Sequence, residues 1–109
     1  MISAMFGRSG VRIAVAAALS LYLGTAHADE SKVTIDNFTF APAELKVKVG
    51  DTVTWSNHDD IPHTVVSAGK FRSKAMDTDG TFSFTFTSAG EYKYFCSLHP
   101  HMTGTIKVE

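Results

Sequence analysis

Residues 81–108 read TFSFTFTSAGEYKYFCSLHPHMTGTIKV, and hydrophobic and polar residues alternate through three successive runs of this stretch. An alternation with period two is typical of β-strands that bury one face. The turn signals Asp79-Gly80 and Ala89-Gly90 bound the first run. We therefore predict three consecutive strands. Their inward-facing residues are Phe82, Phe84 and Phe86, then Tyr92, Tyr94 and Cys96, then Ile106 and Val108.

The same alternation extends upstream. Similar runs lie at 33–35, 45–49, 53–55 and 64–66, separated by turn and proline signals. Helical periodicity is absent over any useful length, and a helical turn would fit only at 70–77. Six to eight short strands in one small domain predict an all-β, antiparallel sandwich or small barrel.

The composition is that of one small, foldable domain. Of the 109 residues, 44% are hydrophobic and 19% are charged, which excludes disordered, collagen-like and coiled-coil chains. A formal net charge of -1 provides no basic surface, so we predict no nucleic-acid partner. The single cysteine, Cys96, has no partner for an internal disulfide, which leaves it as a thiol, a metal ligand or an intermolecular link.

The N-terminal segment has the pattern of a secretory signal peptide. Residues 1–12 carry two arginines and no acidic residue, residues 13–24 form an uncharged apolar run, and Ala26-His27-Ala28 is a small-x-small cleavage site. The run is too short to span a bilayer as a mature helix, which disfavours the alternative of an uncleaved anchor. We therefore predict a cleaved signal peptide at 1–28, a mature domain at 29–109, and a periplasmic location.

Cys96, His99 and Met102 follow one another at C-x2-H-x2-M spacing where two predicted strands join. A hairpin loop brings its ends together, so a thiol, an imidazole and a thioether converge there. His63 follows a proline at the start of an upstream strand and is the candidate for a fourth ligand. One Cys, two His and one Met are the ligands of a trigonal copper site with a weak axial thioether. Zinc sites prefer more thiolates or a bound water, and iron–sulfur clusters need more cysteines.

Two separated segments, 61–65 (IPHTV) and 90–102 (GEYKYFCSLHPHM), make the chain resemble the cupredoxins, or small blue copper proteins, and within them the amicyanin-like branch. The short spacing of the second segment is similar to the ligand loop of amicyanin rather than to the longer loops of azurin or plastocyanin. The resemblance covers the whole mature chain and implies a Greek-key β-sandwich that binds one type 1 copper ion. The implied equatorial ligands are His63, Cys96 and His99, and the implied axial ligand is Met102.

Two positions depart from the usual pattern of that family. Many relatives have proline before the loop histidine, where this chain has Leu98. If the Leu98 amide points at the Cys96 sulfur, it stabilises the thiolate and raises the reduction potential. Relatives commonly carry asparagine after the first histidine ligand, where this chain has Thr64. We expect Thr64 with Ser97 to replace the link that this asparagine makes between the two ligand-bearing segments.

Four protein ligands leave no open position for a substrate, so we predict an electron carrier and not an enzyme. The resemblance implies that His99 exposes one ring edge within an apolar patch formed by Leu98, Pro100 and Met76. It also implies redox protein partners, of the kind that amicyanin has in an amine dehydrogenase and a c-type cytochrome. We expect a monomer that is not inserted in a membrane and whose contacts with partners are small and transient.

The same residues leave two other functions open to comparison. A copper-binding or copper-delivery protein is the main alternative, with the exposed His101 beside the ligand loop as weak support. A thiol-dependent hydrolase is disfavoured, because Cys96 and His99 lie too close on one tight loop for a separately oriented base. The acidic segment His58-Asp59-Asp60 is typical of a solvated turn, and its place just before His63 also makes it a candidate for partner selection. One of the strand tyrosines, Tyr92 or Tyr94, is expected to form a corner hydrogen bond.

Overall fold

The structure is a computed structural model that describes residues 28–109. The predicted signal peptide therefore lies, except for Ala28, outside the described residues. Within 28–109 the chain forms strands only, and the segment 70–77 contributes a short strand instead of a helical turn. The strands are β1 (Glu30–Asp36), β2 (Thr39–Ala41), β3 (Glu44–Val47), β4 (Thr52–Asn57), β5 (Val66–Ser67), β6 (Phe71–Arg72), β7 (Thr81–Thr85), β8 (Gly90–Cys96) and β9 (His99–Val108). None of the described segments is a helix of the length and apolarity needed to cross a bilayer.

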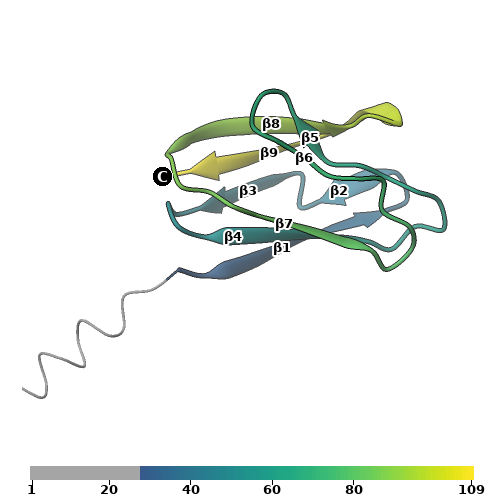
Figure 1. Cartoon of the computed structure of the whole chain (residues 1–109), viewed down its shortest axis with the longest axis horizontal. Helices are drawn as coiled ribbons and strands as arrows, with labels where there is room; N and C mark the ends of the chain where they lie inside the picture. The colour runs from purple at the N-terminus through teal and green to yellow at the C-terminus, as the bar shows by residue number, and fades with distance from the viewer. Residues whose placement is uncertain (1–27) are drawn as a thin grey trace, which may run out of the picture.

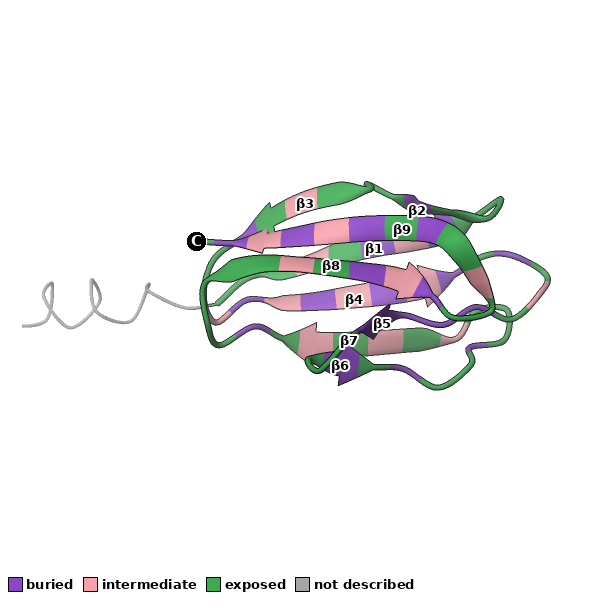
Figure 2. Ribbon diagram, turned by 90° about the horizontal axis from the view of Figure 1, so that it is seen from above, coloured by how far each residue is buried: buried purple, intermediate pink, exposed green. Residues whose placement is uncertain are grey.

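Two sheets face each other as a sandwich (Figure 1). One sheet has the order β2-β1-β4-β7 and the other the order β3-β9-β8-β5-β6. Buried and more exposed residues alternate along the strands, most regularly in β4 and β9 (Figure 2). This is the pattern of strands that bury one face against a partner sheet. The all-β sandwich predicted from the sequence is confirmed.

Both sheets are mixed, which differs from the purely antiparallel sandwich that we predicted. β1 runs parallel to β4, with Val33 opposite Trp55, and β3 runs parallel to β9, with Leu45 opposite Ile106. The consecutive strands β2 and β3 belong to different sheets, so the chain crosses over before β4 returns beside β1. Hydrophobic alternation reports which face of a strand is buried and carries no information on the direction of its neighbour.

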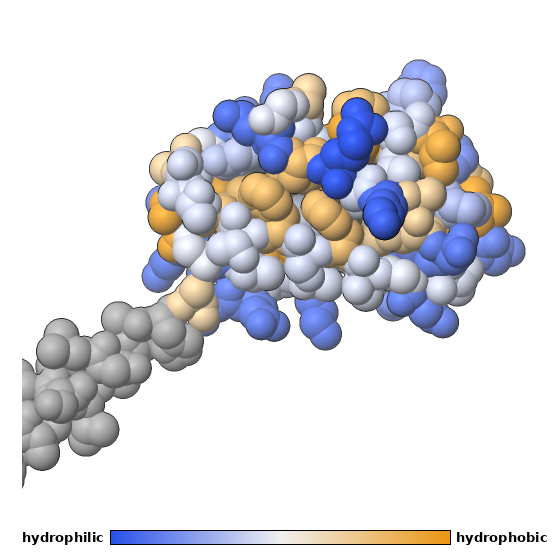
Figure 3. Space-filling model, in the orientation of Figure 1, coloured by the Kyte–Doolittle hydropathy of each residue, from blue (hydrophilic) through white to orange (hydrophobic). Residues whose placement is uncertain are grey.

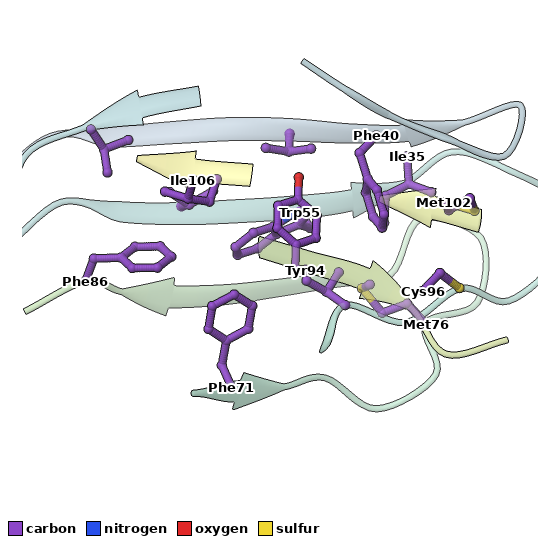
Figure 4. Close-up of a cluster of buried hydrophobic side chains, with 14 of the residues drawn as sticks. Ile35, Phe40, Trp55, Phe71, Met76, Phe86, Tyr94, Cys96, Met102 and Ile106 are labelled. Atoms are coloured by element: carbon purple, nitrogen blue, oxygen red, sulfur yellow. The ribbon is translucent and has the colours of Figure 1, made fainter. Parts of the chain in front are cut away.

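An aromatic cluster fills the space between the sheets (Figure 4). Trp55 is fully buried, and its ring centroid lies 5.4 Å from that of Tyr94 and 5.6 Å from that of Phe71. Phe82 and Phe84, on the edge strand β7, are only half-buried. Figure 3 shows hydrophobic surface between polar side chains in the region of β6 and β7, in agreement with this partial burial. The predicted aromatic core therefore forms, and it is least covered at the sheet edge.

Two tyrosines of β8 are fixed by close contacts. The Tyr92 hydroxyl donates a hydrogen bond to the Ser88 carbonyl at 2.8 Å, which is the predicted corner hydrogen bond. Tyr94 packs over Gly104 of β9, where an added Cβ atom would overlap the tyrosine ring. Gly104 therefore allows β9 to pass close to a buried aromatic side chain.

The segments that carry the candidate ligands meet at one end of the sandwich. β8 ends at Cys96 and β9 begins at His99, so their hairpin projects at the end opposite to the C-terminus (Figure 1). His63 lies between β4 and β5, where an isolated bridge pairs it with Met76. The turn between β1 and β2, Asn37-Phe38, lies at the same end, because Phe38 contacts both histidines.

Candidate metal centre

One thiol and two imidazoles converge at this end of the sandwich. The Sγ atom of Cys96 lies 3.7 Å from Nδ1 of His63 and 3.6 Å from Nδ1 of His99. The three atoms all lie within 4.8 Å of one another. Cys96 and His63 are fully buried and His99 is half-buried. The structure thus brings together three of the four ligands predicted from the sequence.

Local backbone structure explains why these side chains meet. The His63 N–H donates to the Met76 carbonyl at 3.2 Å, and the Met76 N–H donates back to His63 at 2.8 Å. This bridge fixes the position of His63 in an otherwise irregular segment. In the hairpin, the strand register shifts after Phe95, so that Cys96 pairs with His99. The two-residue connection then places both side chains at the same end of the sandwich.

Asp59 orients the His63 ring. Nε2 of His63 lies 2.7 Å from Oδ2 of Asp59, and the pair is buried. The carboxylate oxygen accepts a hydrogen bond from His63 Nε2 and so fixes the ring with Nδ1 towards the Cys96 sulfur, as in carboxylate–histidine–metal arrangements. The Phe38 N–H, with further contributions from Asn37 and His63, lowers the pKa of Asp59 to about 2 against the opposing effect of burial. Asp59 is therefore a charged acceptor at neutral pH.

This finding corrects our interpretation of His58-Asp59-Asp60 as a solvated turn, because Asp59 is 9% exposed and serves the metal centre. The sequence holds one weak signal of this role, since the acid stands four residues before the histidine. Spacing alone does not distinguish such a carboxylate from the exposed Asp60 beside it.

The Cys96 thiol is held in its thiolate form. Burial raises the pKa of Cys96, but hydrogen bonds from the Thr64 backbone and from the His63 and His99 side chains outweigh it and lower the pKa to about 6. The Thr64 N–H lies 3.3 Å from the sulfur and the Thr64 hydroxyl 3.7 Å. Thiolate is the form in which cysteine binds metals. The apo-protein therefore presents a ready ligand at neutral pH.

Thr64 and Ser97 form the link that we predicted between the two ligand-bearing segments. The Ser97 N–H donates to Thr64 Oγ1 at 2.7 Å, and the two hydroxyl oxygens are 2.8 Å apart. In the described part of the chain, the backbone N–H that donates to the Cys96 sulfur belongs to Thr64 and not to Leu98. Leu98 is instead 52% exposed.

The donor set fits copper. For metal–nitrogen and metal–sulfur bonds of protein length, near-trigonal to tetrahedral ligand atoms lie about 3.5–3.8 Å apart. The two measured sulfur–nitrogen distances, 3.7 and 3.6 Å, fall in this range. A thiolate with two imidazoles is the equatorial ligand set of blue-copper sites. These observations define the class of the protein as a small β-sandwich metalloprotein with a copper site at one end.

The structure also places the remaining residues that the sequence singled out near the ligand loop. Met102, on β9, is 5% exposed and lies at the same end of the core as Cys96 (Figure 4), and its bond to a metal remains a prediction. Met76 is 6% exposed, so our placement of Met76 in the exposed apolar patch is wrong. Pro100 and His101 are exposed, as expected.

Comparison with known proteins agrees with this class. The family model for copper binding proteins of the plastocyanin/azurin family matches residues 27–109, and the chain belongs to this family. It is 40% identical to the amicyanin of Paracoccus denitrificans over 83 residues, which are 71% of this chain and 63% of the relative. It is 38% identical to the amicyanin of Paracoccus versutus over 88 residues, which are 75% of this chain and 67% of the relative. The chain thus spans about two thirds of the length of these two relatives.

Solved structures give the same result. The copper(I) form of an amicyanin variant superposes with a TM-score of 0.71 at 37% identity, covering 73% of this chain and 82% of that one. A purple cupredoxin from Nitrosopumilus maritimus superposes with a TM-score of 0.70 at 32% identity, covering 72% of this chain and 99% of that one. The cupredoxin fold implied by the resemblance is confirmed.

Proposed function

We propose that this protein is a one-electron carrier of the periplasm, which holds one copper ion through His63, Cys96 and His99 as equatorial ligands and Met102 as the axial ligand. The observation that carries the proposal is the convergence of one thiol and two Nδ1 atoms, two of the three residues fully buried. When bound, the ion supplies a Cu(I)/Cu(II) couple.

The protein residues keep the site in one shape. The His63 ring is held by Asp59 at Nε2, and the His63 backbone is held by Met76. The Thr64–Ser97 contacts join the His63 segment to the Cys96 loop. A site whose ligands are fixed by their surroundings changes little between oxidation states, which favours fast electron transfer. The buried thiolate and imidazole also leave little room for a substrate.

His99 provides the route for the electron. Its side chain is half-buried, at the start of β9, between the buried Cys96 and the surface. The exposed apolar side chains of Leu98 and Pro100 flank it in the sequence. A small apolar surface around a partly exposed ligand is suited to brief contacts with redox proteins.

The relatives support a choice of partners. Three amicyanins are among the matches, and a methylamine utilization protein of Methylorubrum extorquens is 33% identical over 92 residues. We propose that an amine dehydrogenase donates the electron and that a c-type cytochrome accepts it, with the chain acting as a monomer. We propose the periplasm as the site of these encounters, supported by the signal-peptide pattern of residues 1–28.

The experiment is a redox cycle of the copper-loaded chain 29–109. On addition of one equivalent of Cu(II), we expect an intense visible thiolate-to-copper charge-transfer band, absent in Cys96→Ser. The band should disappear on reduction and return on oxidation over repeated cycles with no copper lost to the solvent. A colourless wild-type protein, or loss of copper in each cycle, contradicts the proposal.

The same cycle tests the copper-delivery alternative. A delivery protein releases Cu(I) to an acceptor in the reduced half of the cycle, and the exposed His101 is the feature that favours this function. The burial of Cys96 and His63 favours retention. It also argues against a hydrolase, because a nucleophilic thiol with no exposed surface does not reach a substrate.

A further inference from the structure

The turn between β1 and β2 carries an exposed aromatic residue in an unusual backbone conformation. Phe38 has a φ of 60° and Asn37 a φ of 51°, both in the left-handed region. This region suits glycine and asparagine and is unfavourable for a large side chain. The Phe38 side chain is also 50% exposed. A strained backbone and an exposed ring together suggest that this ring has a role.

The Phe38 ring lies edge-on to both candidate imidazole ligands. Its centroid is 5.6 Å from that of His63 at an interplanar angle of 87°, and 5.1 Å from that of His99 at 89°. The two imidazoles are themselves 4.9 Å apart. Edge-to-face contact is a favourable arrangement for aromatic rings at these distances. The three rings therefore form a closed cluster beside the Cys96 sulfur.

The backbone of the turn is fastened to the same carboxylate that orients His63. The Asn37 N–H donates to Asp59 Oδ1 at 2.6 Å, and the Phe38 N–H donates to Asp59 Oδ2 at 3.0 Å. That Oδ2 atom also lies 2.7 Å from His63 Nε2. The position of the Phe38 ring is thus fixed relative to the ligand and not only to the turn.

We propose that Phe38 is a positioning residue of the metal centre. Its ring holds the His63 and His99 imidazoles against the copper position and covers one side of them from water, so that it slows the loss of copper. The inference rests on the proposed copper site, and it assigns a role to a turn that lies far from the ligands in the sequence.

The backbone conformation makes the proposal testable separately from folding. Asparagine adopts the left-handed φ of residue 38 with little steric strain. Phe38→Asn therefore removes the ring and also lowers the strain of the backbone at this position. A purely structural role predicts that copper retention and apo-protein stability fall together. A positioning role predicts that copper retention falls while apo-protein stability stays level or rises.

The experiment uses the copper-loaded chain 29–109 and its variants. The rate of Cu(I) loss from the reduced protein to an excess of bicinchoninate is measured, together with the thermal midpoint of each apo-protein. We expect Phe38→Asn to lose Cu(I) about tenfold faster than wild type, the scale set by two lost aromatic contacts. Phe38→Tyr should keep the wild-type rate, because it retains the ring. Val49→Asn is the matched control, since Val49 is 49% exposed and lies in the turn that leads into β4, away from the candidate ligands.

The outcomes separate this inference from the proposed function. Copper binding by wild type with equal rates in wild type and Phe38→Asn overturns the role of Phe38 and leaves the carrier function intact. The same holds if Phe38→Tyr loses copper as fast as Phe38→Asn. Failure of wild type to bind copper contradicts the proposed function itself. If Phe38→Asn does not fold, Phe38→Gly, which also tolerates a positive φ, gives the same comparison.

Discussion

The Thr64 hydroxyl oxygen lies 2.7 Å from the backbone nitrogen of Ser97, although the two residues are 33 positions apart in the chain. It also lies 2.8 Å from Ser97 Oγ and 3.7 Å from the Cys96 sulfur. One assignment of protons satisfies all three contacts: Ser97 donates from its N–H and its hydroxyl, and Thr64 donates to the sulfur. A single side chain thus joins two segments and stabilises the thiolate.

Thr64→Val removes this link and leaves the Ser97 N–H without its partner. We expect the apo-protein to lose about 0.5–1.5 kcal/mol of unfolding free energy, the net contribution of a hydrogen bond, because these contacts are only part-buried. Urea unfolding measures the loss. The control is Thr85→Val, because Thr85 Oγ1 pairs with Thr52 Oγ1 at 2.7 Å on an exposed face. Equal losses of unfolding free energy in Thr64→Val and Thr85→Val would show that the Thr64–Ser97 contact stabilises the protein no more than an exposed hydroxyl pair does.

Asp59→Asn removes the charged acceptor that holds His63 and the β1–β2 turn. The folded pKa of Asp59, about 2, is below the ordinary value of 3.8. Its stabilising contribution is therefore complete above pH 3.8 and is lost as the pH falls towards 2. We expect apo Asp59→Asn to be less stable than wild type at neutral pH and the difference to shrink across that window in urea unfolding. Asp60→Asn, at an exposed neighbour, should show neither effect, and a difference that persists at pH 2 would refute this account of Asp59.

The Cys96 thiol makes the stability of the apo-protein depend on pH in a second window, at higher pH than the window set by Asp59. Its pKa is lowered from 9.0 to about 6 in the folded apo-protein. Between these values the folded state binds fewer protons than the unfolded state, so unfolding becomes less favourable as the pH rises. We expect the stability advantage of apo wild type over Cys96→Ala to increase from pH 6 to pH 9. The ultraviolet absorbance of the thiolate should titrate near pH 6, and a midpoint near 9 would contradict the contacts described for the sulfur.

Gly104→Ala tests the packing of β9 against Tyr94. A Cβ atom at this position overlaps the buried tyrosine ring, and overpacking of a core costs about 1–3 kcal/mol. We expect a lower thermal midpoint in calorimetry with an unchanged charge-transfer band, because the ligands lie beyond the clash. An unchanged thermal midpoint would mean that β8 and β9 can move apart at Gly104 without loss of stability, which would contradict the close packing described here.

The strands and most of the ligands are predictable because their signals are local. Period-two alternation reports burial directly, and the spacing between Cys96 and His99 is fixed by a short hairpin. His63 is less local, but its residue type and its place after a proline single it out. At the strands and at these three candidate ligands, residue type and the geometry of the local chain are sufficient for a prediction from sequence.

The features that the sequence did not reveal depend on contacts between distant segments. The parallel pairing of β1 with β4 follows from a crossover between the two sheets. The alternation of hydrophobic and polar residues does not indicate the direction of a neighbouring strand. Asp59 and Met76 are buried only because other strands cover them, while their neighbours in the sequence resemble a surface loop. Phe38 contacts the two histidines through a turn whose position is set by Asp59. Each of these relationships exists only in the folded chain.

The central claim is that His63, Cys96 and His99 share one metal ion, and X-ray absorption at the copper edge tests it most directly. The copper-loaded chain 29–109 should show one copper per chain with two nitrogen scatterers and one sulfur scatterer at short distance, and Cys96→Ser should lose the short sulfur scatterer. A wild-type spectrum fitted by nitrogen and oxygen alone, with no short sulfur distance, would contradict the account.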